Sequence, residues 1–138
     1  MKFEPKKTKF KYMHLPRRLF KRSANDKLVF GECGFQAVYS GTFTSKQMEI
    51  IRLIMLRYIK VYKRGYFLIR MFAHRQYSQR SPGTRMGSGK SPIVTRIALI
   101  KKNKIICEVK DMSEEQIKVI YRNIRAISGI KLRQVRKD

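Results

Sequence analysis

The chain contains no Asp or Glu between Glu49 and Glu108, although this stretch carries fourteen Lys and Arg residues. Over the whole chain, 33 basic residues stand against 9 acidic ones, so the formal net charge is +24 on 138 residues. A compact fold with this charge repels itself and needs a polyanion to neutralise it. Nucleic acid supplies one, because phosphates that pair with basic side chains release their counterions. The charge pattern therefore predicts a nucleic-acid partner.

The hydrophobic content limits the other classes of protein. Hydrophobic residues make up 43% of the chain, including eight Phe and seven Tyr, which is enough for one modest core. An acidic membrane surface could also neutralise the charge, but no apolar run reaches the roughly 18 residues of a spanning helix. Residues 1–7 lack the apolar segment of a secretory signal. We therefore expect a single domain and no membrane partner.

Residues 1–22 are predicted to form a basic N-terminal arm. They include nine Lys and Arg and one Glu, interleaved with aromatic residues. Aromatic rings stack on bases and cations pair with phosphates, so we expect the arm to become ordered on RNA; a flexible tail is the alternative. The arm cations predicted to bind RNA are Lys6, Lys7, Lys9, Lys11, Arg17 and Arg18.

Residues 23–138 are predicted to form a single α+β domain. Phe35, Ala37 and Tyr39 alternate with the residues between them, which predicts that they share one face of a strand. Because only Lys101–Asn103 separates two later apolar segments, these are expected to pair as a hairpin. The segments predicted as strands are residues 28–42, 66–73, 93–100, 104–110 and 130–135.

Two capping boxes predict the helices. In the first, Thr44 is the N-cap and Gln47 the third helical residue, and the helix is expected to run to about Tyr62. Ser113 and Gln116 have the same spacing and open a second helix. The order of elements predicts two helices packed on a mostly antiparallel sheet.

Cations also lie on the side of the first helix opposite its apolar stripe, and one arginine interrupts the apolar run that follows. These side chains could simply be solvated, but with this total charge a phosphate contact is at least as well supported. The body cations predicted to bind RNA are Arg57, Lys60, Arg64 and Arg70.

Residues 74–92 lose all apolar periodicity and are rich in Arg, Ser and Gly. A segment this long and irregular inside a compact domain is usually functional or disordered. Gly87–Ser91 resembles the end of a nucleotide-binding P-loop, but Thr84 stands where the motif needs its first Gly. Pro92 and a β-rich run also replace the helix that must follow. We therefore expect a loop that contacts anions and no nucleotide hydrolysis.

The sequence predicts no enzyme, cofactor or metal site. His14 and His74 have no neighbouring carboxylate, and the acid-free stretch lacks the acids that a metal-dependent nuclease needs. Cys33 and Cys107 lack the spacing of a zinc site and are expected to be small buried residues. A free RNA-binding regulator and an RNA-processing enzyme are the alternatives to a structural RNA-binding protein.

Five blocks of the chain are similar, in order and spacing, to the motifs of one protein family. They resemble the family's PKRTKFRK, FGxxGLKA, LTxxQIE, WIRVFP and RMGxGKG motifs. The matching blocks are Pro5–Lys11, Phe30–Ala37, Phe43–Glu49, Leu68–Ala73 and Arg85–Lys90. On these residues the chain is identified as a member of the bacterial-type L16 (uL16) family of the large ribosomal subunit. It departs from the motifs at Leu68, where Trp is usual, at Ala73, where Pro is common, and at Ser91, where the loop motif ends in Gly.

The resemblance implies an α/β-hammerhead type of fold and a structural role in the large ribosomal subunit. The implied partners are large-subunit rRNA, tRNA and neighbouring large-subunit proteins. The RMGxGKG loop of the family reaches toward the peptidyl transferase region and helps to seat tRNA near the A site. The residues assigned to this loop are Arg80, Arg85, Met86, Gly87, Ser88, Gly89 and Lys90.

Composition also suggests an origin. The chain has fifteen Ile but only five Ala and no Trp, a bias typical of an AT-rich genome. The first family motif begins at Pro5, which leaves no room for a transit peptide before it. Both observations favour a protein encoded in an organelle and located in the mitochondrial ribosome. A bacterial cytoplasmic or plastid ribosome is the alternative.

Overall fold

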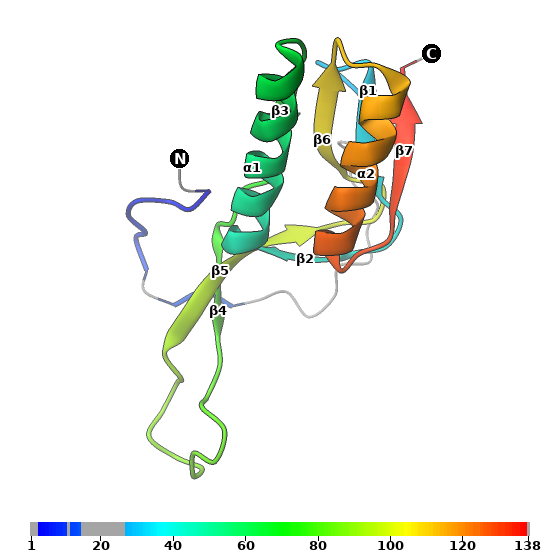
Figure 1. The fold of residues 1–138 in the computed structure, drawn as a ribbon. Helices are drawn as coiled ribbons and strands as arrows, with labels where there is room; N and C mark the ends of the chain where they lie inside the picture. The colour runs from blue at the N-terminus through cyan, green and yellow to red at the C-terminus, as the bar shows by residue number, and fades with distance from the viewer. Residues whose placement is uncertain (1–2, 11, 15–26, 138) are drawn as a thin grey trace.

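The structure, a computed structural model, describes residues 3–10, 12–14 and 27–137 (Figure 1). Three of the predicted RNA-binding residues, Lys11, Arg17 and Arg18, lie outside the described residues. The elements are β1 (Cys33–Ala37), β2 (Gly41–Thr44), α1 (Ser45–Tyr62), β3 (Tyr66–Ile69), β4 (Arg75–Ser78), β5 (Ile93–Ile100), β6 (Ile105–Lys110), α2 (Glu114–Ser128) and β7 (Leu132–Arg136).

The strands form two antiparallel sheets. The larger has the order β3-β6-β1-β7 and the smaller the order β2-β5-β4. Helices α1 and α2 lie side by side over the larger sheet, and their apolar faces complete one buried core with it (Figure 1). The predicted α+β class is therefore confirmed, although the strands divide into two sheets where one was expected.

Both helices begin where the capping boxes predict. The Thr44 hydroxyl accepts a hydrogen bond from the Gln47 N–H at 3.2 Å, and the Gln47 side-chain oxygen accepts one from the Thr44 N–H at 2.9 Å. Ser113 and Gln116 exchange the same pair of bonds at the start of α2. Helix α1 ends at Tyr62, as expected. Short-range signals thus predicted the helices accurately.

The predicted hairpin between residues 93–100 and 104–110 is wrong. Strands β5 and β6 follow each other in the chain but belong to different sheets, since β5 pairs with β2 and β4 while β6 pairs with β1 and β3. The connection between them is bonded to β1. The Asn103 N–H donates to the Ala37 carbonyl at 2.9 Å, and the Gln36 side-chain amide donates to the Asn103 carbonyl at 2.6 Å. These hydrogen bonds fix the connection to β1 at the point where the chain passes from the smaller sheet to the larger one.

The boundaries of the predicted irregular segment also change. Residues 75–78 form β4, which pairs with β5 in a register that places Arg75 opposite Ile97. The sequence of β4 is polar and gives no strand pattern, so pairing with β5 determines its conformation. The expected strand 66–73 stops at Ile69. Beyond it, the Ala73 N–H donates to the carbonyl of Phe3 in the N-terminal segment at 3.0 Å.

Strand β1 is buried on both faces. Gln36 is therefore as inaccessible as its apolar neighbours, and Tyr39, which was expected to share a face with Phe35, lies beyond the strand and is exposed. Alternation fails here because β1 is a central strand between β6 and β7. Cys33 and Cys107 are both buried and free, as predicted.

Candidate nucleic-acid interface

Residues 79–92, here called the loop, extend far from the rest of the molecule beyond the ends of β4 and β5 (Figure 1). Every residue from Ser81 to Lys90 is exposed. Met86 is 95% exposed, which is unusual for a large apolar side chain. The loop therefore presents its side chains outward and has no apolar core of its own.

The Arg80 side chain forms hydrogen bonds with the backbone of the loop. Its guanidinium donates to the carbonyl of Arg85 at 3.2 Å and to the carbonyls of Gly87 and Gly89 at 2.7 Å each. Together with neighbouring residues, Arg80 lines a hollow of about 250 Å³ in the loop. The predicted interface residue Arg80 thus bonds to the loop backbone.

The tip of the loop requires left-handed backbone. Gly87, Ser88 and Gly89 have φ values of 118°, 54° and 72° in succession. A Cβ added at Gly87 or Gly89 would meet no atom within 4 Å, so space does not demand glycine there. The backbone conformation is what favours glycine at these positions, because residues with a side chain rarely adopt a positive φ. The glycines of the RMGxGKG-like block therefore encode the shape of the loop.

The described part of the N-terminal arm reaches the base of the loop. The Lys90 ammonium lies 4.9 Å from the centre of the Tyr12 ring, and the Arg75 guanidinium donates to the His14 carbonyl at 3.4 Å. Phe3 packs against the core. The predicted arm cations Lys6, Lys7 and Lys9 are all exposed. Arm and loop base, predicted as separate binding elements, are therefore adjacent.

The predicted helix cations lie elsewhere. Arg57 and Lys60 are exposed in the second half of α1, and Arg64 follows its end. This end of α1 points away from the loop (Figure 1). None of the three forms an ion pair with any acid that the structure describes. They are free to meet phosphate, but on a surface separate from the loop.

Arg70 was predicted to bind RNA, but its guanidinium is bonded within the protein. It forms an ion pair with Glu108 at 2.5 Å and donates to the Lys27 carbonyl at 2.8 Å. The Arg70 side chain is 18% exposed and the Glu108 side chain 0%. Arg70 therefore balances a buried carboxylate and does not act as a free cation.

Glu108 is the residue of most structural consequence that the sequence prediction missed. Its second carboxylate oxygen accepts three backbone hydrogen bonds, from Val29 at 3.1 Å and from Phe30 and Gly31 at 2.7 Å each. Burial raises the pKa of Glu108, but the three N–H donors and Arg70 outweigh burial and lower the pKa overall. A lone acid in one apolar run and a lone arginine in another were the signal that could have predicted this pair.

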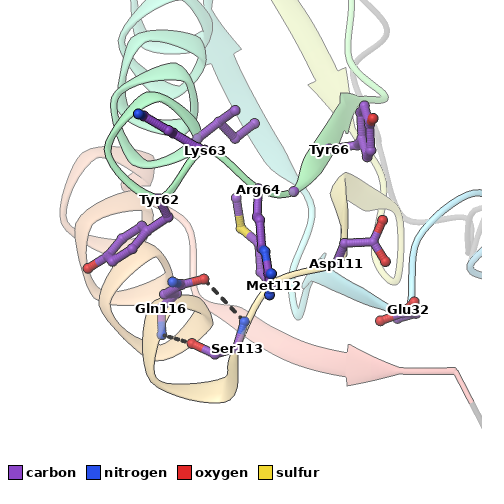
Figure 2. A pocket seen from close by; sticks show the side chains of 11 residues that line it. Glu32, Tyr62, Lys63, Arg64, Tyr66, Asp111, Met112, Ser113 and Gln116 are labelled. Carbon is purple, nitrogen blue, oxygen red and sulfur yellow. Dashed lines mark hydrogen bonds between the residues drawn. The ribbon is translucent and has the colours of Figure 1, made fainter.

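A hollow of about 1100 Å³ lies between the end of α1 and the start of α2 (Figure 2). Charges of both signs line it, including Arg64 and Asp111. The polar groups of Ser113 and Gln116 at its rim are occupied by the capping box, drawn as dashed lines in Figure 2. The hollow is therefore lined by a surface of mixed charge.

Residues 3–10, 12–14 and 27–137 contain neither a metal cluster nor a membrane span. In these ranges no three His, Cys, Asp or Glu side chains gather in a way that could hold a metal ion. No helix in them is long and apolar enough to cross a membrane.

Comparison with known proteins identifies the family of the chain. The family model of ribosomal protein L16p/L10e matches residues 5–134, almost the whole chain. The chain belongs to this family. The resemblance inferred from the five ordered motifs is therefore confirmed, and this L16-family protein is a structural constituent of the large ribosomal subunit and not an enzyme.

Curated L16-family relatives agree. The large ribosomal subunit protein uL16 of Staphylococcus carnosus (strain TM300) is 35% identical over 111 residues, which covers 80% of this chain and 76% of the relative. The uL16 proteins of Staphylococcus aureus (strain Newman) and Staphylococcus haemolyticus (strain JCSC1435) match with the same identity and coverage. As an L16-family protein, the chain has rRNA and other ribosomal proteins as partners.

Proposed function

We propose that the loop of this protein helps to position tRNA near the A site and the peptidyl transferase centre, while the arm and the exposed helix cations hold the protein on large-subunit rRNA. The observation that carries the proposal is the loop itself. It is fully exposed from Ser81 to Lys90, is bonded internally by Arg80, and extends far from the rest of the molecule (Figure 1).

The chemistry of these residues fits a tRNA contact. A guanidinium binds phosphate through two parallel hydrogen bonds. An exposed thioether with three rotatable bonds adapts to an irregular apolar surface such as a base or ribose. Glycines on either side of Ser88 allow the backbone to approach closely. This part of the loop therefore combines a charge, an adaptable apolar group and accessible backbone.

Replacing Arg85 with Ala tests the tRNA role. Large subunits that carry Arg85→Ala should assemble normally but bind A-site tRNA about tenfold or more weakly, which is the order of one charge-assisted hydrogen bond. Arg122→Ala is the matched control, because Arg122 is an exposed arginine on α2. Filter binding of tRNA to purified subunits measures the effect. An assembly defect combined with normal tRNA binding would contradict the proposal.

The arm is proposed to bind rRNA through Lys6, Lys7 and Lys9. Replacing all three with Ala should flatten the dependence of log binding constant on log salt by about 0.7 to 0.9 for each phosphate that the arm no longer neutralises. The measurement is binding to large-subunit rRNA over a series of salt concentrations, with Lys118→Ala on α2 as an exposed control. An unchanged slope would show that the arm does not pair with phosphate.

We also propose that the ribosome in question is mitochondrial. The support is compositional: fifteen Ile and no Trp indicate an AT-rich coding sequence, which is typical of organelle genomes. Mass spectrometry of ribosomes purified from isolated mitochondria should detect the protein. Its recovery only from plastid ribosomes, or from the ribosomes of a bacterium, would replace this location with one of those.

A further inference from the structure

We propose that Arg80 is a positioning residue: it holds the loop in the shape that presents Arg85 and Met86, and it makes no nucleic-acid contact itself. The consequence for tRNA rests on the proposed function of the loop. The role in shaping the loop does not, because it follows from contacts within the free protein. Three hydrogen bonds from one guanidinium carry the inference.

The geometry suits arginine alone among the cationic side chains. A guanidinium is planar and carries five N–H donors in a fixed fork. Nη1 of Arg80 donates to the Arg85 carbonyl, while Nη2 donates to the carbonyls of both Gly87 and Gly89. A lysine ammonium is a single point on a flexible stem, so it cannot span these acceptors in the same way. A lysine at position 80 would therefore keep the positive charge but not the three hydrogen bonds.

Little else in the loop opposes a collapse of this shape. All ten residues from Ser81 to Lys90 are exposed, so burial contributes almost nothing to their order. Apart from the contact of Lys90 with the Tyr12 ring, the structure describes one other side-chain interaction between residues 81 and 90. It is a local hydrogen bond from the Thr84 hydroxyl to the Ser81 carbonyl at 2.8 Å. Ser88 adopts a φ of 54°, which a residue with a side chain disfavours. The Arg80 bonds to the carbonyls on both sides of Ser88 offset that preference.

The contacts of Arg80, Arg85 and Lys90 indicate different roles for these three cations. Both terminal nitrogens of Arg80 face backbone carbonyls, and the Lys90 ammonium faces the Tyr12 ring. Arg85 uses only its backbone carbonyl in these contacts, so its side chain is the one that the loop extends outward. Within a block that carries three cations, Arg85 is the recognition group and Arg80 is its support.

The test compares Arg80→Lys and Arg80→Gln with wild type in the full-length free protein. The readout is the initial rate of cleavage after Arg85 by an arginine-specific protease, since both variants keep that site. Loss of the bonds that Arg80 makes should raise this rate at least about tenfold in both variants. Arg122→Lys on α2 is the control and should leave the rate unchanged. The melting temperature should not move in any variant, because the loop packs against no core.

Two outcomes would overturn the inference. The first is cleavage after Arg85 at the wild-type rate in Arg80→Lys. It would show that the loop keeps its shape without the guanidinium hydrogen bonds of Arg80. A fall in melting temperature that parallels the rise in cleavage would show a general structural role.

A second measurement separates the inference from the function on which its consequence rests. Subunits carrying Arg80→Lys should bind A-site tRNA about tenfold more weakly and P-site tRNA normally. Faster cleavage with unchanged A-site binding would leave Arg80 as the support of the loop and remove the proposed tRNA role. Weaker A-site binding with unchanged cleavage would make Arg80 a direct contact and overturn the inference.

Discussion

Arg70 and Arg80 both direct their guanidinium groups at the protein itself, but in opposite surroundings. Arg70 lies at the edge of the core and pairs with Glu108, whose side chain is wholly buried. Arg80 lies in an exposed loop and bonds only to backbone carbonyls. Removing the partner of Arg70 leaves a partly buried cation and three backbone N–H donors without their acceptor. The partners of Arg80 lie in an exposed loop and can bond to water instead. The body, residues 27–78 and 93–137, is stabilised by its buried core. The loop is stabilised by the hydrogen bonds of Arg80 to its backbone.

Arg70 was predicted to bind rRNA and Arg80 was assigned to the tRNA-proximal loop, but the guanidinium groups of both bond within the protein. At a buried position of the body, such as that of the Glu108 carboxylate, a polar group needs a protein partner because water does not reach it. In the loop, water reaches every group, and the bonds of Arg80 select one backbone shape among several. Changes in the body should therefore alter stability, and changes in the loop should alter the presentation of Arg85.

The largest expected effect is that of Glu108→Ala. Removing the carboxylate leaves Arg70 and the N–H groups of Val29, Phe30 and Gly31 without their acceptor, so the free energy of unfolding should fall by about 3–5 kcal/mol. Urea denaturation followed by circular dichroism measures it. Glu49→Ala, which breaks only the surface pair with Arg52, should cost far less. Equal losses in the two variants would break the comparison between buried and exposed pairs.

The same site predicts a dependence of stability on pH. The pKa of Glu108 is lowered in the folded protein, so its carboxylate contributes fully above the unfolded-state pKa of about 4.3. That contribution is lost as the pH falls from there through the folded-state pKa. Urea denaturation between pH 6 and pH 3 should show this loss in wild type and a smaller one in Glu108→Gln. Identical pH profiles would show that Glu108 does not titrate with unfolding.

A smaller effect is expected at the start of α1. Thr44→Ala removes the hydroxyl that accepts the Gln47 N–H and should lower the free energy of unfolding by about 1 kcal/mol. Thr44→Ser keeps the acceptor and is the control. A loss as large for Ser as for Ala would assign the effect to the methyl group of Thr44 and not to the cap.

The smallest effect on stability is expected for Met86→Ala. Because Met86 is 95% exposed, the free energy of unfolding should change by less than about 0.5 kcal/mol. Large subunits carrying this variant should nevertheless bind A-site tRNA more weakly, if Met86 contacts it as proposed. A loss of stability above about 1 kcal/mol would show that the loop packs on the body, and the distinction between the two regions would then fail.

How far the sequence predicted the molecule follows from the range of each signal. The helix starts were accurate because Thr44 and Gln47, and likewise Ser113 and Gln116, meet three residues apart. The division into two sheets was missed because it depends on Asn103 bonding to Ala37, which are far apart in the chain.

The site shows the same limit. The glycines and cations of the loop were found as a group, since they lie in one short block. The hydrogen bonds that Arg70 and Arg80 make within the protein were not predicted, because a sequence shows that an arginine is present but not which acceptor it meets. The contact between Tyr12 and Lys90, which joins the arm to the loop base, was equally hidden.

The bonds of Arg80 have a consequence for how such proteins diversify. Its three acceptors lie five, seven and nine positions farther along the chain, so one short segment contains both the support and what it supports. A segment of this kind can be exchanged between relatives as a cassette, with its shape carried in its own sequence. Substitutions in the body leave these contacts in place, because all three acceptors of Arg80 lie within the loop itself.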